Sequence, residues 1–467
     1  MKKRLVKKIT AYAAAGATAL AALPAAAVPV LADGEASAPD LGSKIVFQGS
    51  ENYGGALDDS FKAVARTRDG GYVAVGYSWA ASTDPAWGHV ASTNNYAYSD
   101  GLVVKFNADM GVEWAQNFGG TGTDVLFDVD VLENGTIVAA GQSFLAEKVG
   151  NAVNASGWVL MIDPDDPSLF KEMFPGGSKG DYLQTVCAME DNEFVVLGYS
   201  ASTDAGDWEN STGTTCGLAI AYVSEGEVNW AVANNVGGSA GLTTLKRSRF
   251  FGGCVDQNGD VIAVGDIQIG RSLYPSQIVK LDGMSGETVW SRIVGTDRTE
   301  DPTDLSENHT SCFTDVDTLT DGSYAVVGYS KGYDYLTEEA LDAIGTQDSV
   351  IVRYGADGSF LNGEVVGTID RTVDFTGITA TSDGGYFAYG SADSELIEGF
   401  QKERGYTFGN AGAHDFLLIK YDAGNNCVWS ESYGADAGDY INGMIVTDEG
   451  HLVGVGHRGI VRYSFLK

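Results

Sequence analysis

DGGYVAVGYS, at residues 69–78, is the stretch that decides the fold of this 467-residue chain. An Asp-Gly pair typical of a tight turn precedes a short apolar strand, and the strand closes on Gly76. The same order recurs about every sixty residues, a spacing typical of one four-stranded blade of a β-propeller. The closing glycines of the seven units are Gly76, Gly141, Gly198, Gly265, Gly328, Gly390 and Gly456.

Each unit continues in the same way on both sides of this turn. Before the turn, one position is always large and apolar, as at Phe61 and Leu126. After the closing glycine comes a third strand such as LVVKF (102–106), and then an outer strand that often carries an aromatic residue, as at Trp114 and Trp230. Short strands that alternate with turn residues, with no stretch of helical period, predict an all-β fold.

The two ends of the chain complement each other. The seventh unit stops at Lys467, straight after its third strand, and has no outer strand of its own. KIVFQGSENYGG (44–55) resembles the outer strand of the first unit, VEWAQNFGG (112–120). We therefore predict a single seven-bladed β-propeller over residues 43–467, with four-stranded blades and a ring closed by the N-terminal strand, which completes the last blade. Such closure removes the open sheet edges that favour aggregation.

The first 32 residues are typical of a bacterial signal peptide. MKKRLVKK (1–8) is basic, a run of small apolar residues follows, and Val30 and Ala32 precede a cleavage position before Asp33. A retained membrane anchor is the alternative. No lipoprotein cysteine follows the run, and no wall-sorting signal is recognised at the C-terminus. We expect a short linker over residues 33–42 and a secreted mature protein that is not inserted in the membrane.

The mature chain is strongly acidic. Removal of the leader leaves 24 basic residues against 63 acidic ones, a formal net charge of −39. Such a field repels nucleic acid and anionic membranes, and both are excluded as partners. We expect a soluble monomer. The five cysteines leave at least one thiol unpaired, and a ring of this size needs no disulfides, so mostly buried free thiols are expected.

A known repeat resembles these units. DGGYVAVGYS (69–78) with DGLVVKFNADMGVEWAQNFGG (100–120) is similar to the exported β-propeller repeats of bacteria and archaea, and DGSYAVVGYS (321–330) and DGGYFAYGSA (383–392) repeat the likeness. The resemblance covers nearly all of the mature chain and implies the propeller fold. It implies no activity, because such repeats build secreted and surface proteins of mostly unassigned role.

The long connections of the predicted blades share one face of the ring. Loops of this kind on a rigid scaffold commonly carry binding residues. Here they hold aromatic side chains beside carboxylates and amides, which suit stacking on sugar rings and hydrogen bonding to hydroxyls. For each aromatic residue the alternative is packing of its loop against the ring. The candidate ligand-binding residues are Trp79, Trp87, Tyr96, Tyr98, Trp208, Tyr333, Tyr335 and Tyr406.

Two Asp-Val-Asp triplets form a second candidate site. Asp128 and Asp130 in the second unit occupy the same places on an innermost strand as Asp315 and Asp317 in the fifth, and alternate side chains share a face. Hard cations bind several such oxygens, so these four residues are candidate metal ligands, with calcium as the predicted cofactor. The alternative is that they are hydrated or capped by neighbouring backbone N–H groups.

The sequence favours a binding or adhesion module that presents its long-loop face to a glycan or a surface protein. One alternative is an extracellular glycoside hydrolase or polysaccharide lyase, which needs two carboxylates across a pocket on that face. Another is a structural scaffold of a surface assembly. No catalytic residue can be assigned. A deep pocket with an acid of raised pKa would indicate an enzyme, and a shallow aromatic platform would indicate a binding module.

Overall fold

The computed structural model describes residues 45–465, except 53–58, 80–97, 121, 145–154, 205–207, 209–214, 235–244, 270–273, 295–309, 332–347, 368–372, 394–413, 434–440, 448–449 and 458. The predicted signal peptide and linker lie outside the described residues. Residues Pro39–Lys467 belong to one compact unit, to which the following description refers. In the part of the chain that is described, no helix is long and apolar enough to cross a membrane.

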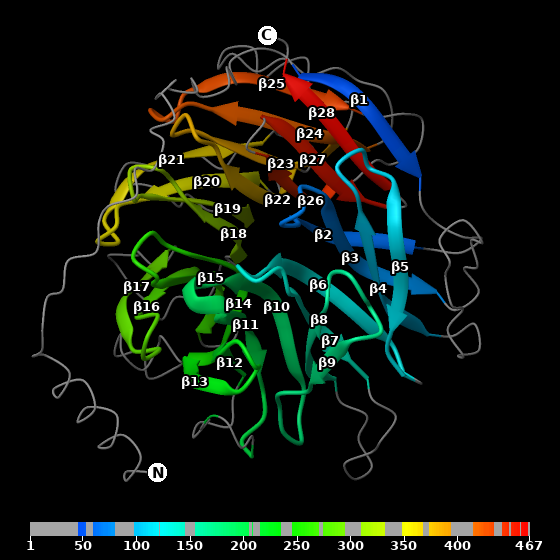
Figure 1. Ribbon diagram of the computed structural model, residues 1–467. Helices are drawn as coiled ribbons and strands as arrows, with labels where there is room; N and C mark the ends of the chain where they lie inside the picture. Colours follow the sequence, from blue (N-terminus) through cyan, green and yellow to red (C-terminus); the bar gives the residue numbers. More distant parts are fainter. Residues whose placement is uncertain are drawn as a thin grey trace, which may run out of the picture. The chain divides into compact units, whose positions relative to one another are not determined.

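The strands form seven antiparallel four-stranded sheets (Figure 1). Six of them, called blades 1 to 6, each consist of four consecutive strands. Blade 1 contains β2 (Asp59–Arg66), β3 (Tyr72–Trp79), β4 (Ser99–Phe106) and β5 (Val112–Phe118); blade 2 contains β6 (Asp124–Val131), β7 (Ile137–Ser143), β8 (Ser156–Ile162) and β9 (Phe170–Met173); blade 3 contains β10 (Asp181–Ala188), β11 (Phe194–Ser200), β12 (Cys216–Tyr222) and β13 (Val228–Asn234). Blade 4 contains β14 (Leu245–Val255), β15 (Val261–Ile269), β16 (Ser276–Leu281) and β17 (Thr288–Val294); blade 5 contains β18 (Thr310–Thr318), β19 (Tyr324–Lys331), β20 (Asp348–Tyr354) and β21 (Phe360–Val366); blade 6 contains β22 (Val373–Ala380), β23 (Tyr386–Asp393), β24 (His414–Tyr421) and β25 (Cys427–Tyr433).

The remaining sheet combines both ends of the chain. Its order is β26 (Ile441–Val446), β27 (His451–Gly456), β28 (Gly459–Phe465) and then β1 (Ile45–Asn52), which pairs antiparallel with β28. We call it the closing blade. The innermost strands β2, β6, β10, β14, β18, β22 and β26 contact one another in that order, and β26 contacts β2. Six blades, not seven, are therefore continuous in sequence, and the remaining sheet is made from both ends of the chain. The predicted count of seven blades is corrected to six continuous blades and one composite closing blade.

The closing glycines of the first six units are explained by a close backbone contact. Every innermost strand has a register shift just after its large apolar residue, as between Phe61 and Ala63 in β2. This bulge bends the strand toward its neighbour. A Cβ atom on Gly76 would lie 1.9 Å from the carbonyl oxygen of Ser60, so no larger residue fits there.

The predicted tight turns join the first two strands of the blades. The Gly70 N–H donates to the Thr67 carbonyl oxygen and the Thr67 N–H to that of Gly71, so the loop has three residues and not two, and Gly70, with a φ of 85°, takes the left-handed position that closes it. Blade 3 has no glycine in this turn, and Asp191 and Asn192 adopt φ values of 57° and 60° instead, within the short 3₁₀ helix η2 (Glu190–Asn192). Asp and Asn tolerate this conformation better than other non-glycine residues.

The core lies between neighbouring blades. Between blades 1 and 2, for example, Val75 and Val103 pack against Leu126, Val129 and Trp158, all of them buried. A corresponding apolar cluster fills each of the other interfaces around the ring, including both sides of the closing blade. Burial of this apolar surface is the main stabilising contribution of the ring.

Four blades share an ion pair with a buried cation that ties the third strand to the hairpin turn. In each, the basic residue of the third strand reaches a carboxylate of the turn between the first two strands, at 2.5 to 3.0 Å. The pairs are Lys105 with Asp69, Lys280 with Asp256, Arg353 with Asp321, and Lys420 with Asp383. These four cations therefore stabilise the blades, by joining the third strand to the turn.

Candidate ligand-binding site at the channel mouth

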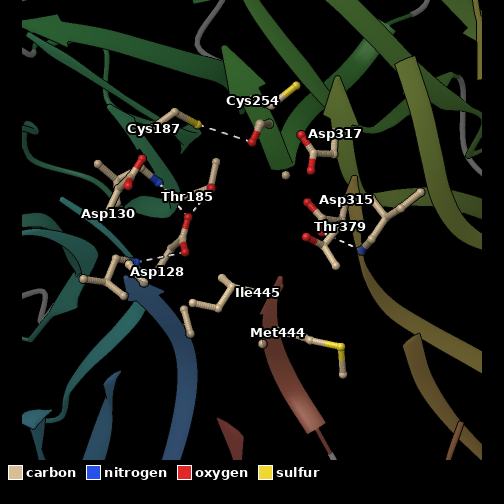
Figure 2. A pocket seen from close by; sticks show the side chains of 18 of the residues that line it. Asp128, Asp130, Thr185, Cys187, Cys254, Asp315, Asp317, Thr379, Met444 and Ile445 are labelled. Carbon is tan, nitrogen blue, oxygen red and sulfur yellow. Dashed lines mark hydrogen bonds between the residues drawn. The ribbon is translucent and has the colours of Figure 1, made fainter. Parts of the chain in front are cut away.

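A central channel separates the innermost strands. It contains a cavity of about 530 Å³ with residues of all seven innermost strands in its wall (Figure 2). Alternate residues of these strands form two layers along the channel. The layer nearer the long connections consists of Ala63, Asp128, Thr185, Gly252, Asp315, Gly377 and Gly443, and the other layer consists of Ala65, Asp130, Cys187, Cys254, Asp317, Thr379 and Ile445.

The first pair of predicted metal ligands caps the neighbouring strand. Asp128 Oδ2 accepts hydrogen bonds from the Val186 N–H, at 2.9 Å, and from the Thr185 hydroxyl. Asp130 Oδ2 accepts the Ala188 N–H at 2.7 Å. The other oxygen of each carboxylate accepts the N–H of the next residue on its own strand. The pair thus ties β6 of blade 2 to β10 of blade 3.

The second pair repeats this arrangement across the channel, where Figure 2 shows it opposite the first. Asp315 Oδ2 accepts the Ile378 N–H at 3.0 Å, and Asp317 Oδ2 accepts the Ala380 N–H at 2.8 Å. These bonds connect β18 with β22. All four carboxylates of the Asp-Val-Asp triplets therefore accept hydrogen bonds from backbone N–H groups, as the alternative to metal binding expected.

Burial perturbs the ionisation of these channel acids. It raises the pKa of Asp128 to about 6 and that of Asp315 to about 8, although hydrogen bonds from backbone N–H groups partly offset the rise. Burial also raises the pKa values of Asp130 and Asp317. The negative charges of Asp317 and Asp128 add to the effect at Asp315. With a pKa of about 8, Asp315 is mostly protonated near neutral pH, whereas Asp128, with a pKa of about 6, is mostly ionised.

Within the described ranges, no group of three or more His, Cys, Asp or Glu side chains is disposed to hold a metal ion. The predicted calcium site stays a prediction, because the long connections that could supply further oxygens lie mostly outside those ranges.

All five cysteines are free thiols, as expected. Cys187 and Cys254 lie in the second channel layer, and Cys187 Sγ lies 3.3 Å from the Gly253 carbonyl oxygen (Figure 2). Burial raises the pKa of both thiols well above the usual value. Since the thiolate is the reactive form, these two thiols are unreactive at neutral pH.

Three of the predicted aromatic ligand-binding residues are described. Trp79 ends β3 and is half-buried, and Tyr98, just before β4, is exposed. Trp208 is only 5% exposed and packs in the apolar cluster between blades 2 and 3, so the packing alternative describes it. Trp87, Tyr96, Tyr333, Tyr335 and Tyr406 lie outside the described residues.

A different group of side chains stands out on the same face, where blade 3 meets blade 4. We call it the Arg–Tyr cluster. Its position follows from the strands: Tyr182 is the second residue of β10, Tyr199 is the last but one of β11, and the long strand β14 supplies the arginines. The cluster adjoins the channel, because Phe251 also lines the central cavity. Its members are Tyr182, Tyr199, Arg247, Arg249, Phe251, Asp266 and Tyr274.

One buried carboxylate holds both arginines of the cluster. Arg249 donates from Nε to Asp266 Oδ1, at 2.9 Å, and from Nη2 to Oδ2, a bidentate pair. Arg247 Nη2 lies 3.5 Å from the same Oδ2. The Asp266 side chain is 4% exposed, whereas those of Arg249 and Arg247 are 24% and 31% exposed. The guanidinium groups thus reach the surface while their anchor does not.

Aromatic rings surround these guanidinium groups. Arg249 Cζ lies 4.7 Å from the ring centroid of Phe251 and 5.7 Å from that of Tyr199. Tyr199 stacks on Tyr182 with the centroids 4.8 Å apart, and Arg247 lies over the Tyr274 ring at 5.0 Å. The tyrosine rings and Phe251 are half-buried, so part of each faces solvent.

A sequence signal for this cluster exists. LKRSRFF (245–251) places Arg, Arg and Phe at alternate positions of an innermost strand, with Phe251 at the bulge, and no other unit carries an arginine at the positions of Arg247 and Arg249. Alternation puts Arg247, Arg249 and Phe251 on one face. The tyrosines stand next to the closing glycine or at the strand start. What the sequence does not show is that residues of two blades meet there.

Comparisons with known proteins concern the fold only. No family model matches this chain, and no curated protein matches it. Solved structures that resemble it include a streptogramin B lyase (9% identity, 90% of this chain, 98% of that chain, TM-score 0.48) and the WD40 β-propeller domain of Doa1 (10%, 91%, 98%, 0.47). BamB from Moraxella catarrhalis is another (12%, 90%, 100%, 0.41). By its sheet topology the protein is a β-propeller with four-stranded blades.

Proposed function

We propose that this protein is a secreted binding module that holds a glycan on the long-loop face, at the Arg–Tyr cluster. The observation that carries the proposal is the stack of Tyr182 on Tyr199 beside two partly exposed arginines. Aromatic faces bind the C–H face of a sugar ring, and neighbouring donors bind its hydroxyls. The leader-like first 32 residues support an extracellular location, and the repeat resemblance supports membership of the exported propeller repeats.

The test is a glycan-array and polysaccharide-pulldown screen on the mature chain from Asp33 onward. Tyr199→Ala should weaken binding of the retained glycan about tenfold, in line with the loss of one stacking partner. Phe360→Ala, which removes an exposed aromatic side chain from the outer strand β21, should leave binding unchanged. Parallel arms with Ca²⁺ and with a chelator test the calcium prediction. If no glycan binds, either with Ca²⁺ or with the chelator, a scaffold role would be favoured.

Catalysis in the channel is the second candidate. It is favoured by one observation, namely that Asp128 and Asp315 are acids of raised pKa in the wall of a cavity. Against it, every oxygen of the two carboxylates already accepts a hydrogen bond from a backbone N–H. Cleavage of a bound polysaccharide by the wild type but not by Asp315→Asn would move this candidate to first place.

A further inference from the structure

We propose that the ligand of the Arg–Tyr cluster is an anionic glycan whose sugar rings bear carboxylates. This inference rests on the proposed function and specifies its ligand class. Tyr182, which Tyr199 supports by stacking, forms the platform for a sugar ring, and the free edges of Arg247 and Arg249 bind the carboxylate of that ring. Arginine binds carboxylates through two parallel N–H donors, which adds geometric specificity to the charge attraction.

The charges of the cluster are unbalanced. Two guanidinium groups share the single carboxylate of Asp266, which leaves one positive charge in a chain whose formal net charge is −34. By contrast, Lys105, Lys280, Arg353 and Lys420 are buried, each against a turn carboxylate of its own blade. The Arg–Tyr cluster therefore offers cationic charge at the surface that no carboxylate of the described residues other than Asp266 neutralises.

Hydrogen-bond donors of the cluster also remain unused. Asp266 occupies Nε and Nη2 of Arg249 and approaches Nη2 of Arg247. Arg247 Nε is buried and has no hydrogen-bond partner among the described residues. Of the five N–H donors of each guanidinium group, those on Nη1 likewise donate to none of the described residues. A carboxylate ligand would pair with the Nη1 donors, which are not among the buried unpaired atoms, whereas Arg247 Nε is out of reach of solvent.

The arginines are held in position before any ligand arrives. The Gln277 side chain donates to the carbonyl oxygens of Arg249 and Asp266, at 2.8 and 3.0 Å, and so fixes β14 against β15. Arg247 forms an isolated bridge with Thr215, which anchors the start of β14 on blade 3. Such preorganisation lowers the entropic cost of binding.

Size and chemistry select a sugar acid over a bare anion. A small anion would use the guanidinium edges alone and gain nothing from the tyrosine stack. A carboxylate-bearing ring places its C–H face on the aromatic platform and its charge on the arginines at once. The sequential rings of a polymer could continue across the long-loop face.

The experiment is calorimetric titration of the mature chain with oligogalacturonates and oligoalginates, each compared with its own methyl ester. The ester has the same rings and linkages but no negative charge. We expect the free acids to bind at least about tenfold more tightly than the esters, with the preference shrinking as NaCl is raised. Arg247→Gln should lower the affinity for the acids about tenfold and leave binding of the esters unchanged.

Two further variants control for folding. Arg249→Gln alone would leave the buried Asp266 carboxylate with only Arg247, at 3.5 Å, so the double variant Arg249→Gln/Asp266→Asn is used, which removes both charges of the bidentate pair together. It should reduce the preference for acids over esters without abolishing it, because Arg247 keeps its charge, while the unfolding transition stays cooperative. Arg292→Gln removes a cation from β17, the outer strand of the same blade, and should leave every affinity unchanged.

The outcomes separate the two proposals. Equal binding of acids and esters, with loss on Tyr199→Ala, would overturn the anionic class and leave a glycan-binding site in place. Preference for acids that survives Arg247→Gln and the double variant undiminished would overturn the assignment to this cluster. If neither acids nor esters bind, the anionic ligand class is overturned. If, in addition, no glycan binds in the wider array and pulldown screen, the proposed function is overturned.

Discussion

At the scale of single residues, the outer-strand tryptophans connect neighbouring blades. Trp230 of blade 3 donates its indole N–H to the Gly283 carbonyl oxygen of blade 4, at 2.8 Å. Trp114 and Trp290 make the equivalent bond to the next blade, at 2.9 and 3.1 Å. A Cβ atom on Gly286 would lie 2.5 Å from the Trp230 ring, so the turn of blade 4 fits directly against the indole.

We predict that Trp230→Phe lowers the free energy of unfolding by about 1–2 kcal/mol, because a buried carbonyl loses its donor and the smaller ring leaves space. Chemical denaturation of the mature chain measures this. Trp290→Phe is the matched comparison and should cost less, since its indole bond is longer and more exposed. Equal losses in the two variants would show that the indole N–H of Trp230 contributes nothing specific.

Residue by residue, the predictability of this protein depends on whether partners lie in the same unit. The turn glycines, the large apolar residues such as Phe61 and the closing glycines follow from the repeat, because their contacts recur within every unit. Trp208 and the Arg–Tyr cluster do not, because their contacts cross between blades and differ from one interface to the next. The face that carries the cluster was predictable, and its members were not.

At the scale of strands, the channel acids join innermost strands that share no sheet. Asp315 and Asp317 of β18 accept backbone N–H groups of β22, and Asp128 and Asp130 of β6 do the same for β10. Neighbouring innermost strands diverge along the channel, so their backbones cannot form a ladder. The carboxylates span that gap. The same D-V-D spacing would also fit a metal site, and spacing alone cannot distinguish the two.

This role makes the stability of the ring depend on pH. The folded-state pKa of Asp315 is about 8, above the usual value of about 3.9, so the folded protein binds this proton more tightly than the unfolded chain. The contribution of Asp315 to stability is therefore fully present below about pH 4 and is lost as the pH rises toward 8. For Asp128, with a pKa of about 6, the loss ends near pH 6.

We predict that the unfolding free energy of the wild type, measured relative to that of Asp315→Asn, decreases as the pH rises from 4.5 to 8.5. A single group can contribute at most about 1.4 kcal/mol per pH unit. Urea denaturation at several pH values measures the difference. Asp165→Asn, in an exposed turn, is the control. A difference that stays constant with pH would mean that Asp315 is ionised throughout the range.

At the scale of the whole molecule, the ring is held shut by pairing of the two ends of the chain. β1 and β28 pair over most of their lengths, with Ile45 opposite Phe465 and Asn52 opposite Gly459. On the other side of the closing blade, Asn442 donates to the Phe61 carbonyl oxygen of blade 1 at 2.7 Å. Opening the ring therefore requires breaking strand pairing as well as packing between blades.

Circular permutants separate these two contributions. Because Ile45 is paired with Phe465, a short hairpin turn can join the old ends without moving either strand. New ends placed between β19 and β20, within blade 5, would again make one blade composite. New ends placed in the connection between β21 and β22 would make every blade continuous and leave the ring closed by side-chain packing alone.

We predict that the permutant opened within blade 5 keeps the unfolding free energy of the parent, whereas the one opened between blades 5 and 6 loses about 1–3 kcal/mol, the scale of loop-closure entropy. The second should also unfold faster, because its terminal blades can separate without breaking a sheet. Both permutants carry the same new turn and differ only in where the ring is opened. Equal stability and equal unfolding rates would show that the composite blade adds nothing to closure beyond the packing that every interface provides.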